Sequence, residues 1–241
     1  MFYGTDLAHV HHVGFGDVAR AAAGVLASEL RKADLPSRRV VDLGCGSGIL
    51  AAALLDSGFA AVGVDISPSM IAEARRQAPE ATFHLASLHE FAIPECAAVS
   101  AVGEALSYLD PGKDAVDLVP LLGRAGQAIV PGGLLLFDVI ESTRTDPMSY
   151  LTTQSGPDWE VTAEVGEDLA RGIITRAITT RRSADQATRA TREVHRVQTF
   201  RREDLERTLD GLGFEVEIRQ AYGDVPLPPR RICVLARKPT R

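Results

Sequence analysis

The sequence lacks long apolar runs, has few cysteines and carries no excess of basic residues. No apolar stretch approaches the roughly 20 residues of a membrane-spanning helix, and the N-terminus lacks the basic and apolar blocks of a signal peptide. Three widely spaced cysteines among 241 residues form neither a disulfide framework nor a metal-ligand pattern. The net charge of −6 argues against nucleic acid as the main partner, because phosphate binding requires a basic surface. We therefore expect a cytoplasmic protein that does not act at a membrane.

The remaining composition is typical of a globular α/β protein. Hydrophobic residues make up 45% of the chain and charged residues 24%, and 241 residues are enough for one large domain with a full core or for two small ones. Short apolar strands alternate with helices, which predicts a mostly parallel sheet covered on both faces. The strands are expected near 39–43, 60–65, 81–86, 97–102 and 133–140, and the helices near 48–57, 68–77 and 114–129.

Residues 40–48, Val-Val-Asp-Leu-Gly-Cys-Gly-Ser-Gly, join a buried strand to a glycine-rich turn and the start of a helix. The bare backbone of the glycines lets a small molecule approach their N–H groups, and the helix N-terminus faces the same place. The spacing differs from the G-x-G-x-x-G of dinucleotide-binding folds, because the third glycine comes one position early. Asp42 ends the strand, and its carboxylate would repel a pyrophosphate but attract an ammonium or sulfonium group.

A second acid, Asp65, ends the next predicted strand, Ala-Val-Gly-Val-Asp. A carboxylate at this place can accept hydrogen bonds from both hydroxyls of a ribose. One acid for an amine and another for a ribose fit S-adenosylmethionine (SAM) better than they fit NAD.

The two segments resemble motifs I and II of class I SAM-dependent methyltransferases, at residues 41–48 and 63–70. The segment that ends Leu-Leu-Leu-Phe-Asp at Asp138 is similar to the fifth strand of that family. The likeness is strongest over residues 38–140 and is to bacterial small-molecule methyltransferases, of the methyltransferase domain 25 type. It implies a Rossmann-like, doubly wound, mostly parallel seven-stranded sheet with an inserted antiparallel flap.

The same resemblance implies a SAM site. Asp42 would lie near the methionine amine, Asp65 would hold the ribose and Ile66 would flank the adenine. Ser87 departs from the family pattern, which often has an acid near the adenine at this position. The implied cofactor-binding residues are Tyr3, Asp42, Gly44, Cys45, Gly46, Ser47, Gly48, Asp65, Ile66, Met70, Ser87, Leu88, Gly103 and Glu104.

Four residues are candidates for orienting the acceptor or accepting its proton. Glu104 and Tyr108 follow the fourth strand, whose end faces the transferable methyl group in the resembled family; a loop acid and a packed aromatic residue are equally good explanations. His195 lies in the middle of a strand, where a structural role is the alternative. His12 belongs to an N-terminal group of histidines and aromatic residues, which we interpret as an arm that closes over the cofactor; a partly disordered terminus is the alternative. No metal site is expected there, because no cysteine or helical spacing accompanies the histidines.

Two motifs are missing after the fourth strand. The segment has no Asn/Asp-Pro-Pro-Tyr/Phe, which argues against methylation of exocyclic nucleobase amines. It also has no aspartate at the strand end, which removes an expected ligand of a catechol-type Mg²⁺ site.

We expect one methyltransferase domain over 1–241. Residues 1–16 are predicted to be an irregular arm, with Asp17 capping a helix near 18–32, and 141–158 a loop. Strands near 159–166, 171–182 and 190–200 form the flap, and a helix at 202–210 with strands at 214–222 and 231–237 completes the sheet. The parts are an N-terminal arm and helix (1–37), a SAM-binding core (38–140), a flap insertion (141–200) and a closing helix and β-hairpin (201–241).

The sequence therefore predicts a SAM-dependent methyltransferase that transfers the methyl group by in-line displacement to a small-molecule acceptor. Arginines are frequent in the flap and bind anions well, but nearby acids are able to neutralise them, so an anionic acceptor is the minority hypothesis. An NAD-dependent oxidoreductase is one alternative, opposed by Asp42 and the early third glycine. A non-catalytic SAM-binding regulatory protein is another. The identity of the acceptor and the oligomeric state are not predicted.

Overall fold

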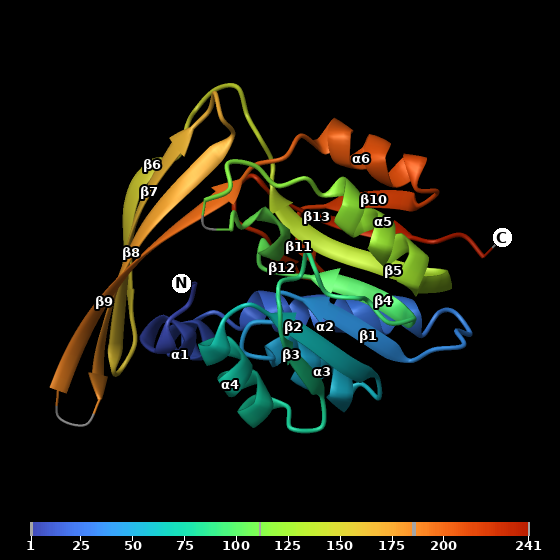
Figure 1. Ribbon diagram of the computed structural model, residues 1–241, viewed down its shortest axis with the longest axis horizontal. Coiled ribbons are helices and arrows are strands. Elements are labelled where there is room, and N and C mark those ends of the chain that lie inside the picture. The colour runs from blue at the N-terminus through green and yellow to red at the C-terminus, as the bar shows by residue number, and fades with distance from the viewer. Residues whose placement is uncertain (1, 111, 185–186, 241) are drawn as a thin grey trace.

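The computed structural model describes residues 2–110, 112–184 and 187–240. Its centre is a seven-stranded sheet with the strand order β10-β13-β5-β4-β1-β2-β3 (Figure 1). Neighbouring strands from β5 to β3 run parallel, and β13 runs antiparallel to both β5 and β10. The predicted mostly parallel seven-stranded sheet is therefore confirmed. Its strands are β1 (Arg39–Leu43), β2 (Ala60–Asp65), β3 (Thr82–Leu85), β4 (Cys96–Ala101), β5 (Ile129–Ile140), β10 (Glu215–Arg219) and β13 (Arg231–Arg237).

Helices cover both faces of this sheet, and successive residues of β5 show how. Leu135 and Phe137 pack in one cluster with side chains of α5 and α6, whereas Leu134 and Leu136 pack in another with those of α2 and α3. A strand buried on both faces needs an unbroken apolar sequence, which is why β5 contains Leu-Leu-Leu-Phe. The covering helices are α2 (Asp17–Leu30), α3 (Ile49–Asp56), α4 (Pro68–Gln77), α5 (Val119–Ala128) and α6 (Arg202–Gly211).

Two strand-to-helix turns bring the acids of β1 and β2 to the same edge of the sheet. Gly48 caps α3 with φ +78°, and a Cβ there would lie 2.9 Å from the Cα of Ala74, so the turn requires glycine. Ser67 caps α4 by accepting a hydrogen bond from the Met70 N–H at 3.2 Å, and Pro68 follows at the first helical position. The predicted helix 68–77 is confirmed.

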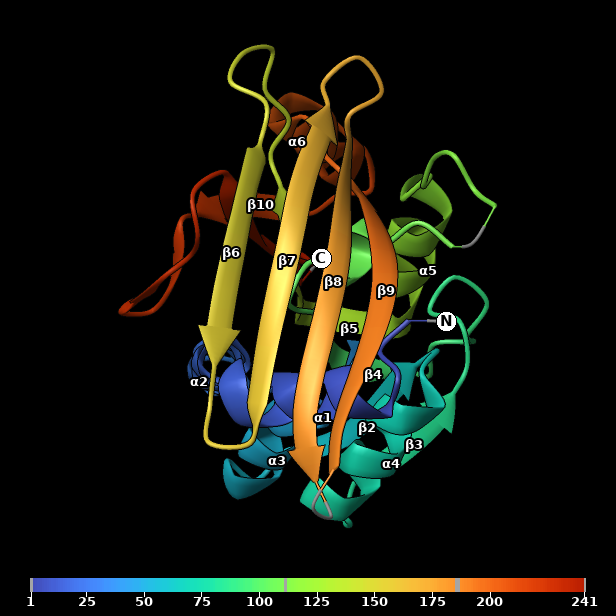
Figure 2. The same cartoon turned by 90° about the vertical axis from the view of Figure 1, so that its left-hand side faces the viewer.

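A second sheet of four antiparallel strands stands against one side of the core and faces the viewer in Figure 2. Its strand order is the chain order, so the predicted antiparallel insertion is confirmed. The prediction of a loop over 141–158 was wrong, because β6 occupies part of it. Every residue of β6 is exposed, so its backbone pairing with β7, rather than burial, holds it as an edge strand. The strands are β6 (Ser149–Ser155), β7 (Trp159–Asp168), β8 (Ile173–Ala184) and β9 (Ala187–Gln198).

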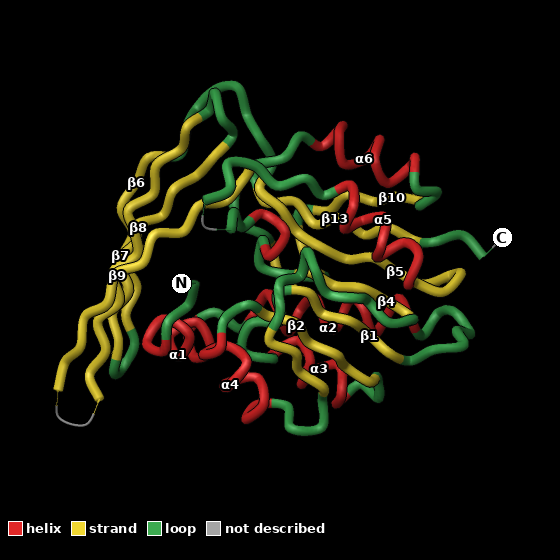
Figure 3. Tube along the Cα trace, viewed as in Figure 1, coloured by secondary structure: helices red, strands yellow, loops and turns green. Residues whose placement is uncertain are grey.

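The N-terminal segment contains a helix, α1 (Thr5–Gly14), which lies between the core and the four-stranded sheet (Figures 1 and 3). The prediction of an irregular arm over 1–16 was therefore wrong for the described residues; Met1 lies outside them. Leu7 and Val10 of α1 pack with Val161 of β7, and these long-range contacts supply the stability that the local sequence does not reveal.

Three boundaries also differ from the prediction. Helix α5 begins at Val119 rather than near 114, and β5 begins at Ile129 rather than near 133. The predicted strand 214–222 is divided into β10 and a two-residue strand, β11 (Ala221–Tyr222), which pairs with β12 (Val225–Pro226). The expected cap of α2 does not form: the Asp17 carboxylate binds the Arg20 guanidinium at 2.8 Å instead.

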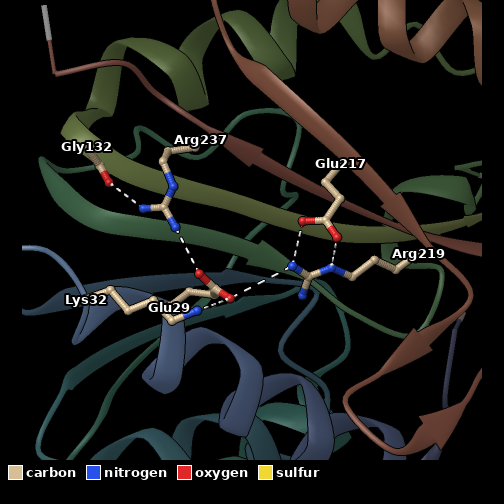
Figure 4. Close-up of polar contacts among 6 residues, drawn as sticks. All are labelled: Glu29, Lys32, Gly132, Glu217, Arg219 and Arg237. Atoms are coloured by element: carbon tan, nitrogen blue, oxygen red, sulfur yellow. Dashed lines mark hydrogen bonds and ion pairs between the residues drawn. The ribbon is translucent and has the colours of Figure 1, made fainter.

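Glu29 connects helix α2 to the β10–β13 edge of the sheet (Figure 4). Its carboxylate accepts hydrogen bonds from Arg237 at 3.0 Å and Lys32 at 2.9 Å, and Arg219 approaches it to 3.9 Å while pairing with Glu217. The network thus joins the end of α2 to two strands of the sheet through ion pairs. No helix of the described chain is long and apolar enough to cross a membrane; the cytoplasmic location stays a prediction.

Candidate active site

A cavity of about 710 Å³ lies where the carboxyl ends of β1, β2 and β4 meet α1 and the inner face of the four-stranded sheet. This size is typical of small-molecule sites. Three of the sequence candidates, Gly48, His12 and His195, do not line the cavity. The candidates that do are Tyr3, Asp42, Gly44, Cys45, Gly46, Ser47, Asp65, Ile66, Met70, Ser87, Leu88, Gly103, Glu104 and Tyr108.

Asp42 places a buried carboxylate at the end of β1. Its Oδ1 accepts a hydrogen bond from the Ser100 hydroxyl at 2.7 Å. Burial raises the pKa of Asp42 to about 7; the Ser100 hydrogen bond opposes this shift and the charge of Asp65 adds to it. No cationic side chain among the described residues pairs with Asp42. The site is therefore favourable for a ligand that brings a positive charge.

Asp65 holds the glycine turn against the end of β2. One oxygen accepts the Gly46 N–H at 2.9 Å and the other accepts the Ser67 N–H at 2.8 Å. Burial raises the pKa of this carboxyl, and the backbone hydrogen bonds oppose the shift. Beside it, Ile66 lines the cavity with 46% of its surface exposed, which leaves an apolar side chain free to contact a flat ring.

Glu104 follows β4 and places a further carboxylate on the cavity wall, and the residue is only 1% exposed. Its Oε2 accepts a hydrogen bond from Arg176 of β8 at 2.6 Å, and its Oε1 pairs with Arg231 of β13. Two guanidinium groups from different sheets thus meet one carboxylate at the cavity wall. Because both oxygens are engaged, the geometry favours an electrostatic role for Glu104 over a simple role as a free base.

Tyr108 and Tyr3 form a hydrogen-bonded pair on the cavity wall, with their hydroxyl oxygens 2.8 Å apart. Burial, with Tyr108 adding to it, raises the pKa of Tyr3 well above its ordinary value, so its hydroxyl stays protonated at neutral pH. The Tyr3 carbonyl also accepts a hydrogen bond from the Ser67 hydroxyl at 2.8 Å. These contacts attach the N-terminal segment to the core at Ser67, which follows Asp65 and Ile66, and at Tyr108.

His195 is completely buried behind this pair rather than in the cavity. Its ring lies 5.4 Å from that of Phe2 and 5.0 Å from that of Tyr3, and its Nε2 lies 3.0 Å from Glu193. Glu193 also accepts the Gly4 N–H at 2.8 Å. The interpretation of His195 as a base in contact with the acceptor is not supported by this position, because it packs against and supports the N-terminal segment.

His11 and His12 of α1 differ in their surroundings. His12 lies 3.1 Å from the Ser47 hydroxyl through Nδ1 and is outside the cavity, so its expected role as a base is not supported by position. His11 lines the cavity instead, and burial lowers its pKa to about 4, which keeps it neutral. Across the described ranges, no three His, Cys, Asp or Glu side chains gather in a way that would hold a metal ion.

Sequence analysis missed several lining residues. Phe2 and His11 were in the N-terminal group that was identified, but the helical face that selects His11 was not predicted. Arg176 was one of many flap arginines, and only the pairing of β8 with its neighbours singles it out. Arg231 had no local signal, because its contact with Glu104 depends on β13 lying next to β5.

The chain matches the model of a family described as a methyltransferase domain over residues 16–217. A Streptomyces fradiae protein named dTDP-3-amino-3,6-dideoxy-alpha-D-glucopyranose N,N-dimethyltransferase is 25% identical over 224 residues, covering 89% of this chain and 86% of that protein. The chain spans about half the length of other curated relatives that it matches.

Solved structures share the fold. DesVI from Streptomyces venezuelae superposes with a TM-score of 0.78 at 19% identity, covering 98% of this chain and all of that one. The sugar N-methyltransferase KedS8 from Streptoalloteichus superposes with a TM-score of 0.76 at 21% identity, covering 99% and 96%. With the family match spanning most of its length, the chain belongs to the methyltransferase domain family, and it shares the Rossmann-like fold of the solved methyltransferases.

Proposed function

We propose that this enzyme methylates an amine of a small acceptor, and that the acceptor is an amino sugar carrying an anionic group. The observation that carries the proposal is that one cavity contains both Asp42, which has no cationic partner among the described residues, and the charged group of Glu104, Arg176 and Arg231. The long relative from Streptomyces fradiae is named for N,N-dimethylation of a dTDP-linked amino sugar, which supports the same class of acceptor here.

The residues at the β1 and β2 ends fit SAM. Asp42 suits the cationic methionine amine, because it is buried and has no cationic partner in the described protein. Asp65 suits the ribose, and Ile66 and Leu88 suit the two faces of the adenine. When bound, SAM supplies a methyl group on a sulfonium, which is already activated for transfer. The protein then has to hold and orient the acceptor and exclude water.

The residues at the other end fit an anionic amine. Arg176 and Arg231 place two guanidinium groups on the cavity wall, and a guanidinium binds a phosphate in a bidentate manner. Arg231 and Arg176 both line the cavity, so both side chains are within reach of an acceptor bound there. Glu104 accepts an N–H of the acceptor amine, and its charge stabilises the ammonium that methylation of a neutral amine produces.

The test is methylation of a defined probe, dTDP-3-amino-3,6-dideoxyglucose, by the purified protein with SAM. Mass spectrometry is expected to show the sugar nucleotide gaining one and then two methyl groups. The matched control is the analogue with a hydroxyl in place of the amine, which we expect to stay unmodified. Glu104→Gln is expected to lower kcat by about 100-fold, in the range of a single electrostatic group.

Three results would contradict the proposal, each in its own way. Methylation of the hydroxyl analogue would assign the wrong acceptor atom. Failure to methylate any amine in a panel of phosphorylated and free amino sugars, despite SAM binding, would favour the regulatory alternative. Tight binding of NADH in a nicotinamide fluorescence titration, without SAM binding, would favour the oxidoreductase alternative.

A further inference from the structure

The buried carboxylate of Asp138, on β5, faces the turn that carries Glu104. Its Oδ2 accepts the Gly103 N–H at 2.9 Å and its Oδ1 accepts the Glu104 N–H at 2.7 Å. Gly103 and Glu104 both have left-handed backbone conformations, with φ of +80° and +62°. Two consecutive N–H groups thus donate to one carboxylate. The carboxylate therefore stabilises a conformation that Glu104, which has a Cβ, adopts only at a cost.

Tyr222 donates to the same oxygen of Asp138 that accepts the Gly103 N–H. Its hydroxyl donates to Asp138 Oδ2 at 2.8 Å, and its side chain is 1% exposed. It lies in the short strand β11, which precedes the β13 strand that carries Arg231. Neither Asp138 nor Tyr222 lines the cavity, whereas Gly103 and Glu104 do. Any effect of the two buried residues on the acceptor must therefore pass through the turn or through Arg231, which lines the cavity and lies near Asp138.

Asp138 is the centre of a hydrogen-bonded group of buried residues. Asp138 receives three donors, two from the backbone of the turn and one from the Tyr222 hydroxyl. Arg231, which pairs with Glu104, also approaches Asp138 Oδ1 to 3.8 Å through Nε. Asp138 thus contacts the backbone of Glu104 and also lies near Arg231, the side chain that pairs with the Glu104 carboxylate. Asp138 therefore holds Glu104 at its backbone N–H, and Arg231 holds it at its carboxylate.

We infer that Asp138 and Tyr222 form a clamp that positions Glu104 toward the acceptor amine. The inference rests on the proposed function, because it takes Glu104 as the residue that contacts the acceptor. Asp138 and Tyr222 are positioning residues, and they set the geometry of Glu104 before the acceptor binds. Preorganisation of this kind acts on catalysis through the placement of charge rather than through new contacts with the substrate.

The first test needs neither cofactor nor acceptor. Tyr222→Phe removes one hydroxyl from the clamp, and Thr199→Val is the matched control, because it removes a buried hydroxyl that donates to the Gly172 carbonyl at 3.2 Å outside the cavity. Hydrogen–deuterium exchange is expected to become at least about tenfold faster for a peptide spanning residues 102–109 in Tyr222→Phe and to stay unchanged there in Thr199→Val. Equal exchange in wild type and Tyr222→Phe would overturn the inference.

The second test separates positioning from general structural support. With the dTDP-amino sugar as probe, Tyr222→Phe is expected to lower kcat by about tenfold while the Kd for SAM changes less than twofold. In the Glu104→Gln background the same substitution is expected to have no further effect, because the residue that it positions is already disabled. Multiplicative losses in the double variant would overturn the inference. If the wild type methylates no probe, the proposed function fails, and the exchange experiment alone decides whether the clamp exists.

Discussion

Replacing Asp42 with asparagine tests whether the negative charge of Asp42 binds the amine of SAM. The pKa of Asp42 is raised from 3.8 to about 7 by burial, which corresponds to about 4 kcal/mol at 1.36 kcal/mol per unit. A carboxyl with a raised pKa in the folded state favours folding when it is neutral. The loss of folding free energy caused by ionising the buried carboxyl therefore begins as the pH rises above 3.8 and is complete above 7. A bound ammonium group offsets that cost.

The expected result is a pH-dependent SAM affinity. Below pH 7 the wild-type Kd for SAM should rise by about tenfold for each pH unit, because Asp42 must lose a proton before it pairs with the ammonium. His11 does not contribute between pH 5 and 7, since its pKa is about 4. Asp65 also has a raised pKa, and Asp65→Asn separates its contribution. In Asp42→Asn the pH dependence should disappear, apart from the part that Asp65 supplies.

Isothermal titration with SAM from pH 5 to 8 measures the affinity, and urea denaturation of the cofactor-free protein measures the stability. Asparagine keeps an acceptor for the Ser100 hydroxyl. The substitution also changes the free energy of unfolding by an amount that does not depend on pH. The stability difference between Asp42→Asn and wild type should nevertheless shift in favour of the variant by up to about 4 kcal/mol between pH 4 and 8. An unchanged slope of Kd against pH in Asp42→Asn would refute the assignment of Asp42 to the amine.

Two further predictions concern the acceptor and the glycine turn. Arg176→Ala should raise the KM for a phosphorylated amino sugar by about 10- to 100-fold, the value of one charged hydrogen bond, and leave the Kd for SAM unchanged; an equal effect on an amino sugar without phosphate would contradict the proposed anion contact. Gly48→Ala should lower the free energy of unfolding by about 2–4 kcal/mol because of its positive φ and the contact with Ala74. Gly24→Ala, on an open helix surface, should raise it by about 0.5–1 kcal/mol, and similar effects of the two substitutions in urea denaturation would refute the structural argument.

The core of the fold and the cofactor side of the cavity were predictable because their signals are local. The apolar strands, the glycine turn and the Ser67–Pro68 helix start each lie within a few residues of sequence. Asp42 and Asp65 end adjacent parallel strands, so the alternation of strands and helices was enough to bring them to one edge.

The acceptor side was less predictable because its parts are distant in the chain. The Glu104 carboxylate meets Arg176 and Arg231 only after two different sheets have formed around it. Helix α1 was missed because its stability depends on contacts with β7, and β6 was missed because an exposed edge strand shows no apolar alternation. The clamp of Asp138 and Tyr222 had no sequence signal, since it joins residues 84 positions apart.

The most direct test of the whole account is a crystal structure with S-adenosylhomocysteine bound. We expect the amine of the ligand beside the Asp42 carboxylate, the ribose hydroxyls on Asp65, and the sulfur facing the part of the cavity that Glu104 and Tyr108 line. Density for the ligand outside this cavity, or a ligand whose amine and ribose avoid both acids, would contradict the account.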